Sequence, residues 1–478
     1  MKLREFLPVL MFSLLSFPVA AQIAGSRDPS FNPNGTGGNF HVFCIELQND
    51  GKILLGTVDG NITYNGVSVE EVVRLNPDGT LDNSLNLGAG FKGGTTIRDI
   101  ALQPDGKILV AGSFNSYDGV PGKGVVRLNS DGSLDPGFQL EPPVTSTAYF
   151  IHELELLPDG SILVAGQINS HSGQPAGGLV KLLSDGTRDV SFNPGGAGAF
   201  PAHVHALAVQ PDGRILVGGV FETFNGVPSK LIVRLHPDGT VDNSFTIGTG
   251  IDGPLPDVES ITLQPDGKIL VGGKFEECNG TAVRSILRLN SDGTLDNGFN
   301  LNGFATSSTV HAIKLQPDGK IIIGGTFQKY DNTQVIGHAR LHPDGTLDKT
   351  FDTTVYNQNV KDVEIDADGK ILVGGAFFIH RMLSQGTANF AEVSGLSFSV
   401  YPNPAKGEFR VRCDGKSQGN VQLEIRNMLG QIEYTTELET VKDSYEKLIV
   451  LPEELPAGNY LLRLVSSTAS GTEILMLD

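Results

Sequence analysis

The sequence predicts an all-β protein: a seven-bladed β-propeller of four-stranded blades, followed by a small Ig-like β-sandwich. The main observation is a phrase built around Pro-Asp-Gly that recurs seven times, 50 to 55 residues apart. A four-stranded unit of about 50 residues fits one blade of a propeller. The composition agrees, because 60 glycines and no tryptophan are typical of many short strands joined by tight turns.

The first repeated phrase reads Gln-Pro-Asp-Gly-Lys-Ile-Leu-Val in the copies that begin at Gln103 and Gln264. In its turn, proline presets φ, aspartate tolerates the bridge region, and glycine takes the left-handed conformation that closes a bulged hairpin. The turn glycines of the seven copies are Gly51, Gly106, Gly160, Gly213, Gly267, Gly319 and Gly369. The four strands of the fourth repeat are expected at 203–210, 214–221, 231–236 and 240–245.

A second phrase occurs six times and ends at Phe245 in the fourth repeat. With Pro-Asp-Gly as its loop, this hairpin places Arg234 opposite Asp242. All six copies pair a base with an acid in this way: Arg74 with Asp82, Arg127 with Asp135, Lys181 with Asp189, Arg234 with Asp242, Arg288 with Asp296, and Arg340 with Asp348. Because the pairs are spread over six blades, we interpret them as structural, each contributing about 0.2–1 kcal/mol.

The missing seventh copy of the second phrase predicts how the ring closes. Residues 27–32 match 188–193, with Asp28 and Phe31 three apart as in the other copies. We therefore expect the N-terminal strand to complete the last blade, which removes two exposed sheet edges. No basic residue aligns opposite Asp28 and Glu392 lies near that slot, so the clasp is expected to lack its ion pair.

These two phrases, Gln-Pro-Asp-Gly-Lys-Ile-Leu-Val-Gly-Gly and Arg-Leu-Asn-x-Asp-Gly-Thr-Leu-Asp, resemble the delta-60 repeat family over about residues 26–393. The resemblance implies a β-propeller but brings no known activity and no catalytic residues. We assign the propeller domain to residues 22–393, including the N-terminal strand that closes the last blade.

After Val393 the period stops, and strands separated by Gly and Pro follow at 409–412, 421–426, 431–434, 445–450 and 458–464. Residues 394–478 resemble the type A sorting domain of the Bacteroidota type IX secretion system. The matching motifs are Tyr-Pro-Asn-Pro at 401, Asn-Met-Leu-Gly at 427 and Leu-Pro-Ala-Gly-Asn-Tyr at 455. The resemblance implies that the type IX machinery is a partner and that the domain is removed or exchanged for a surface anchor. The alternative is an ordinary carbohydrate-binding or adhesive sandwich.

The N-terminus is typical of an export signal. Lys2 and Arg4 precede an apolar stretch at 6–19, and small residues follow at 19–21, so residues 1–21 are expected to be a signal peptide that is removed. No later segment approaches the roughly 20 apolar residues of a membrane helix. The protein is therefore expected to be secreted or held at the outer-membrane cell surface, without a transmembrane segment.

Charge and cysteine content exclude several classes. A formal charge of −19 and a pI of about 4.9 repel phosphate backbones, so no nucleic acid partner is expected. Cys44, Cys278 and Cys413 lie far apart and form neither a disulfide framework nor a zinc motif. A calcium site at Asn76, Asp78 and Asp82 would have three oxygen ligands of the six to eight required. We expect no metal and no cofactor.

Three function classes remain open. The sequence favours a non-enzymatic surface module that binds a glycan or a protein, and it shows no Gly-x-Ser-x-Gly, His-Glu-x-x-His or Cys-x-x-Cys motif. The alternatives are a structural, self-associating surface protein and an enzyme that acts on an extracellular polysaccharide. Acids from several blades converging at one channel mouth would favour the enzyme. A monomer is expected and would disfavour the structural class.

The candidate binding region is the end of the blades opposite the Asp-Gly turns, because varied loops on a rigid scaffold commonly bind ligands. This end carries the connections 86–96, 193–202 and 246–257, and loops with Tyr64, Tyr117, Phe224 and Tyr330. Eight residues before the turn glycines stand Phe43, Arg98, His152, His205, Glu259, His311 and Lys361. The next positions of that strand face, such as Ile100 and Leu102, are apolar. We predict a channel mouth whose three imidazoles could meet a metal, an anion or a sugar. The alternative is a set of solvated strand ends.

Overall fold

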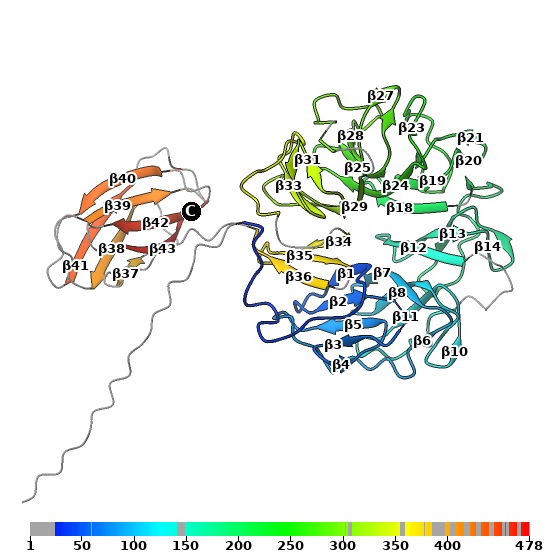
Figure 1. Ribbon diagram of the computed structural model, residues 1–478, viewed down its shortest axis with the longest axis horizontal. Helices are drawn as coiled ribbons and strands as arrows, with labels where there is room; N and C mark the ends of the chain where they lie inside the picture. Colours follow the sequence, from blue (N-terminus) through cyan, green and yellow to red (C-terminus); the bar gives the residue numbers. More distant parts are fainter. Residues whose placement is uncertain are drawn as a thin grey trace, which may run out of the picture. The chain divides into compact units, whose positions relative to one another are not determined.

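Seven three-stranded antiparallel sheets form the blades of the first of two compact units, Ile23–Gly386 (Figure 1). The computed structural model describes residues 24–58, 60–140, 149–201, 203–301, 303–304, 308–353, 359–376, 378–384, 397–401, 408–414, 421–426, 432–438, 444–451, 455, 458–465 and 470–477. The predictions for residues 1–21, Glu392 and the boundary at 393 lie outside these residues. The all-β propeller class is confirmed.

The first strand of each blade is innermost (Figure 1). The first strands are β1 (Cys44–Leu47), β7 (Thr96–Leu102), β12 (Tyr149–Leu156), β18 (His203–Val209), β24 (Asp257–Leu263), β29 (Thr309–Leu315) and β34 (Val360–Ile365). Each one contacts the first strands of the blades before and after it, and β34 contacts β1. The order of the blades therefore closes on itself.

The second strand lies in the middle of each sheet, and the third pairs with its other edge. The second strands are β2 (Ile53–Gly56), β8 (Ile108–Ser113), β13 (Ile162–Ile168), β19 (Ile215–Val220), β25 (Ile269–Lys274), β30 (Ile321–Thr326) and β35 (Ile371–Gly375). The third strands are β5 (Val72–Leu75), β11 (Val125–Leu128), β16 (Leu179–Leu182), β22 (Ile232–Leu235), β28 (Ile286–Leu289), β33 (His338–Leu341) and β36 (Phe378–Met382).

The fourth strand expected at 240–245 is reduced to one bridge, between Leu235 and Val241. The register prediction is correct, since the Asp242 N–H donates to the Arg234 carbonyl at 2.9 Å. The ladder ends there because the Asp242 carboxylate accepts the N–H of Ser244 at 2.9 Å, and such a local turn competes with strand pairing.

The connections between second and third strands form short hairpins. Their strands are β3 (Thr63–Tyr64), β4 (Val67–Ser68), β9 (Ser116–Tyr117), β10 (Val120–Pro121), β14 (Ser170–His171), β15 (Gln174–Pro175), β20 (Thr223–Phe224), β21 (Val227–Pro228), β26 (Glu277–Cys278), β27 (Thr281–Ala282), β31 (Lys329–Tyr330) and β32 (Thr333–Gln334). Three entry strands pair with them: β6 (Phe91–Lys92), β17 (Ala199–Phe200) and β23 (Ile251–Asp252).

The N-terminal segment clasps the last blade. Arg27 bridges Met382, and the Asp28 N–H donates to the Arg381 carbonyl at 2.8 Å. Contrary to the sequence expectation, this clasp has its ion pair, because Arg381 Nε lies 2.9 Å from the Asp28 carboxylate. The last blade has no hairpin between β35 and β36, so its arginine comes about ten residues earlier than in the other repeats.

All six predicted base–acid pairs form at the turn end of the blades, with N–O distances of 2.7–3.6 Å. The arginines also reach the next blade. Arg74 donates to the Ser130 carbonyl at 2.6 Å, Arg234 to Ser291 at 2.5 Å, and Arg381 to Pro77 at 2.6 Å. The arginine pairs thus join their blades to the next blade of the ring.

The second unit contains residues 387–478 and has two antiparallel sheets. Their strands are β37 (Ser397–Tyr401), β38 (Glu408–Asp414), β39 (Val421–Arg426), β40 (Ile432–Leu438), β41 (Ser444–Val450), β42 (Gly458–Val465) and β43 (Ser470–Leu477). Strands β37, β38 and β41 form one sheet, and the other four form the second. Phe409 and Val411 of the first sheet and Leu423, Ile425 and Leu462 of the second are fully buried.

Candidate functional site

Six inner strands carry a β-bulge at the position that the sequence singled out. The register between first and second strands shifts by one residue there, and Arg98, His152, His205, Glu259, His311 and Lys361 are the unpaired residues. A bulge leaves the extra residue out of the ladder and re-aims its side chain. The same position is therefore turned out of the sheet in six blades.

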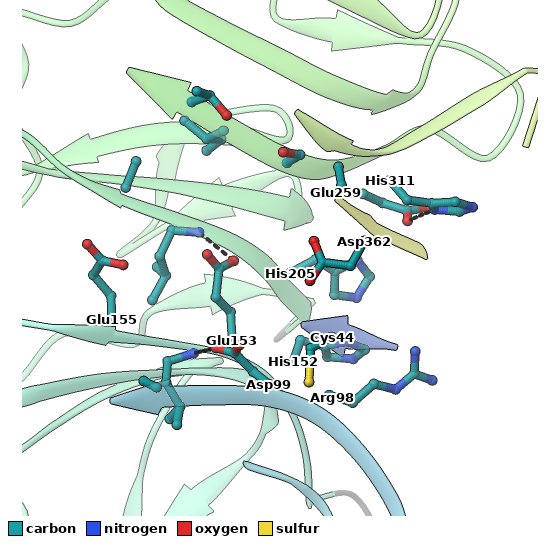
Figure 2. A pocket seen from close by; sticks show the side chains of 18 of the residues that line it. Cys44, Arg98, Asp99, His152, Glu153, Glu155, His205, Glu259, His311 and Asp362 are labelled. Atoms are coloured by element: carbon teal, nitrogen blue, oxygen red, sulfur yellow. Dashed lines mark hydrogen bonds and ion pairs between the residues drawn. The ribbon is translucent and has the colours of Figure 1, made fainter. Parts of the chain in front are cut away.

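These six residues and Phe43 all line one cavity of about 830 Å³ inside the ring. In Figure 2 the labelled bulge residues lie at one end of the inner strands, around a common opening. We call this set of seven residues the channel mouth. The structure therefore brings together all seven residues that stand eight positions before the turn glycines.

Neighbouring blades touch each other through the channel mouth. The Arg98 guanidinium lies 4.5 Å from the centroid of the Phe43 ring, a cation–π contact. The His152 and His205 rings are 4.3 Å apart between centroids. His205 Nδ1 lies 2.9 Å from the Asp257 carboxylate. Arg98 is exposed, whereas Phe43, His152, His205 and Asp257 are only partly exposed, and their contacts with neighbouring blades distinguish these residues from free strand ends.

A second chain of contacts links Glu259, His311 and Lys361 across three blades (Figure 2 shows the first two). Lys361 Nζ lies 3.1 Å from His311 Nε2, and an ammonium group can only donate. Nε2 is therefore the acceptor, and Nδ1 carries the hydrogen that it donates to Glu259. Burial opposes the charge of Glu259, but His311 and Lys361 hold its pKa below the usual value.

His152 is a partly buried, neutral member of the channel mouth. Burial, with His205 and Arg98 nearby, lowers its pKa to about 3, so its imidazole is neutral at pH 7. In the part of the chain that the structure describes, Nε2 of His152 and Nε2 of His205 have no hydrogen-bond partner. The described residues also include no group of three His, Cys, Asp or Glu side chains able to hold a metal ion.

A deeper layer of charged residues was missed by the sequence analysis. Regular alternation from the channel mouth would put Ile100 and Leu102 on the same strand face as Arg98. The bulge shifts that alternation by one residue, so Ile100 packs between blades and its neighbour Asp99 lines the channel. The residues at the two channel-facing levels below the mouth include Glu46, Asp99, Glu153, Glu155, Lys314, Asp362 and Glu364. We call these seven the carboxylate belt.

Three belt carboxylates join one blade to the next through backbone N–H groups. Asp99 accepts from Leu154 at 2.6 Å, Glu153 from Leu207 at 2.9 Å, and Asp362 from Ile45 at 2.7 Å. Burial raises the pKa of Asp99 and of Asp362 to about 7, although the backbone N–H groups oppose the shift. Burial and the charges of Asp99 and Glu155 raise the pKa of Glu153 as well.

Lys314 is the cation of the belt and pairs with Glu364. Burial opposes its charge, but Glu364 and Asp362 raise its pKa. Burial also raises the pKa of Glu155 to about 7 and, with Glu364 and Asp99, that of Glu46 to about 8. Acids from blades 1, 2, 3 and 7 therefore converge on one channel.

The aromatic residues expected in loops of the binding face have another place. Tyr64, Tyr117, Phe224 and Tyr330 are fully buried. The Tyr64 hydroxyl donates to the Gly79 carbonyl at 2.7 Å, and Tyr117 and Tyr330 reach Gly132 and Gly345 in the same way. A hydroxyl that satisfies a turn carbonyl inside the blade serves the core, so these four residues are removed from the candidate site.

Comparison with known families identifies both parts of the chain. The domain of unknown function (DUF5122) beta-propeller matches six times, at 48–85, 103–138, 157–192, 210–245, 264–299 and 316–351. The secretion system C-terminal sorting domain matches residues 399–477. Both family assignments made from the motifs are confirmed. No curated protein matches the chain in sequence.

Solved structures resemble the chain at low identity. One is described as the extracellular domain of a hybrid two component system from B. thetaiotaomicron, with 12% identity, 92% of this chain and 55% of that chain covered, and a TM-score of 0.47. Another is PorZ, a surface component of the type-IX secretion system of Porphyromonas gingivalis, with 14% identity, 94% and 54% covered, and a TM-score of 0.29. The chain spans about half the length of these proteins. No helix among the described residues is long and apolar enough to cross a membrane.

Proposed function

Because the chain carries six DUF5122 β-propeller repeats and a secretion system C-terminal sorting domain, we propose that it is an exported, non-enzymatic binding module. The sorting domain directs it to secretion or to the cell surface. The type IX machinery is then its export partner, residues 1–21 are its removable signal peptide, and its ligand is a glycan or a protein that it binds as a monomer.

One observation carries the binding proposal: the repeats place different polar side chains at the same bulge position around one cavity of about 830 Å³. Arg98 and Lys361 can donate hydrogen bonds, and Glu259 can accept them. A pocket of this size with a few converging polar groups is the common form of a small-ligand site. A sugar with several hydroxyl groups matches such a mixture of donors and acceptors.

The experiment is a glycan and surface-protein array probed with the purified full chain. We expect selective capture of one ligand class, lost when excess soluble ligand of that class is added. Capture of nothing above a serum-albumin control would contradict the proposal. Size-exclusion chromatography separates it from the structural alternative, because a self-associating protein elutes as an oligomer.

The export proposal is tested by truncation. A chain ending at residue 393 should fold but accumulate in the periplasm of its native host, because it lacks the sorting domain. A matched chain with a point change in the exposed turn of the propeller, Asp212→Asn, should be exported normally. Surface delivery of the truncated chain would contradict the role of the sorting domain.

A second candidate is an enzyme that acts on an extracellular polysaccharide. The observation that favours it is the convergence of belt acids, since a carboxyl with a raised pKa, such as Glu155, can act as a general acid. Products released from array polysaccharides by the full chain, and lost in Glu46→Gln and Glu155→Gln, would favour the enzyme. Binding without released products favours the module.

A further inference from the structure

The carboxylate belt holds blades together and also crowds like charges. Three of its carboxylates cross the joints between blades 2 and 3, 3 and 4, and 7 and 1. The belt has six carboxyl groups and one ammonium group, Lys314. At the same levels, β18 and β24 contribute the uncharged residues Ala206, Ala208, Ser260 and Thr262. Full ionisation would therefore leave five net negative charges in one channel.

The groups that face the belt do not neutralise this excess. Above it, the channel mouth carries Arg98 and Lys361 as cations, with Glu259 and Asp257 as anions near them. The three imidazoles of the mouth already contact Asp257, Glu259 or one another. Cys44, at the same level as Asp99, has a pKa raised by burial and by Asp99 and Asp362, so it stays a neutral thiol and does not change the charge of the channel.

We propose that the carboxylate belt makes closure of the ring respond to pH. The contacts between blades are strongest when the belt is protonated and weaken as the belt ionises. A protonated carboxyl keeps an oxygen to accept the N–H of the next blade and carries no charge. An ionised one also accepts that N–H, but each added charge repels the other carboxylates that line the same channel. This proposal needs no ligand and stands apart from the binding proposal.

The direction and the pH range follow from the raised pKa values. Burial raises the pKa of Asp99, Glu155 and Asp362 to about 7 and that of Glu46 to about 8. In an unfolded chain the pKa of these groups is about 4. The folded ring therefore holds protons that the unfolded chain has released. This stabilisation is complete below pH 4 and is lost as the pH rises through 7 to 8.

Buried histidines act in the opposite sense at lower pH. His152, His338 and His380 have pKa values lowered by burial to about 3, 4 and 4, so the stability that they contribute is lost as the pH falls below their unfolded value of about 6.5. Above pH 6.5 the histidine contribution changes little, and it rises with pH whereas that of the belt falls. A fall in stability from pH 6.5 to 8.5 therefore comes from carboxyl groups with raised pKa values, and the belt variants below measure the share of the belt.

The test is the melting temperature of the full chain across that range. We expect the melting temperature to fall by roughly 5 °C or more from pH 6.5 to 8.5, given about 2–4 °C per kcal/mol for chains of this order of size. The double variant Glu46→Gln with Glu155→Gln keeps the three blade-joining carboxylates and should lose at least half of that fall. The control Glu70→Gln with Glu277→Gln removes two exposed charges and should follow the native chain.

A second variant keeps the test decisive if the double variant folds poorly. Lys314→Gln removes the cation of the belt and should steepen the fall, because the acids then retain their protons to higher pH. In hydrogen exchange, peptides with Leu154 and Leu207 should lose protection between pH 6.5 and 8.5 relative to the peptide with Ile313. A native chain with a flat profile, or belt variants with the slope of the control, would overturn the proposal.

Discussion

The two ends of the blades differ in what the repeats keep and what they change. At the turn end, six blades pair an arginine with an aspartate, and the same aspartate accepts a second base, such as Lys107 or Lys268. At the channel mouth, seven blades present Phe, Arg, His, His, Glu, His and Lys in turn. Contacts that recur in every blade serve the ring itself, whereas a position that varies around one cavity can serve a ligand.

Blade 3 shows how the contacts of the turn end change when lysine replaces the arginine. It has Lys181 where the other blades have arginine, and Ser161 where they have a second base. Lys181 lies 3.6 Å from Asp189 and 3.5 Å from Asp159. A lysine is a point donor and cannot bond the aspartate and the next turn at once as the planar arginine does.

The largest effect is expected from removing the clasp. Deleting residues 26–32 takes away Asp28, which leaves Lys370 without this carboxylate and Arg381 with only the longer contact to Asp366 at 3.7 Å. Breaking a buried ion pair costs about 3–5 kcal/mol, so we expect the melting temperature to fall by roughly 10 °C. The exposed edge of β36 should also cause association in light scattering. An unchanged melting curve would show that the ring does not depend on the clasp.

Acid titration should weaken the ion pairs at the turn end of the blades. Although burial opposes it, hydrogen bonds from lysine, backbone N–H and arginine lower the pKa of Asp135 and Asp296 to about 2. Stability from these pairs is present above about pH 4 and is lost as the pH falls toward 2. Circular dichroism from pH 5 to 2 should show unfolding that Asp296→Asn makes less steep. The same slope in that variant would place the acid-sensitive groups elsewhere.

The smallest effect is a gain. Lys181→Arg should add a hydrogen bond to the turn of blade 4, as Arg127 makes with Ser184 at 2.5 Å. We expect about 1 kcal/mol of added stability, measured by urea unfolding. The reverse change, Arg127→Lys, is the matched control and should lose a similar amount. Equal stability of both variants and the native chain would mean that the links between blades contribute nothing measurable.

Much of this fold could be predicted from the repeat alone. The Pro-Asp-Gly turns fix the hairpins, and the spacing places Arg234 opposite Asp242 before any coordinates are known. Arg381 could not be placed. The last blade omits a hairpin, so the partner of Asp28 comes about ten residues before the position that the other repeats indicate, near Glu392. The register of a repeat is readable only where the repeat keeps its length.

The sequence predicted the residues of the channel mouth but not those of the carboxylate belt below it. The position eight residues before each turn glycine gave the whole channel mouth, since the same offset occurs in every blade. Asp99, Glu153 and Asp362 were missed because a bulge reverses the strand alternation, and no residue type marks such a bulge in this chain. Acids one residue after Arg98, His152 and Lys361 were the available signal.

We propose that the channel mouth binds the ligand and that the turn end holds the ring together. The most direct measurement is the affinity of the triple variant His152→Ala, His205→Ala and His311→Ala for the ligand captured on the array, with its melting curve recorded in parallel. We expect at least a tenfold weaker Kd, about 1.4 kcal/mol, with a melting temperature within about 3 °C of the native chain, because these side chains line the cavity and are not core. Undiminished affinity in the folded triple variant would contradict the claim.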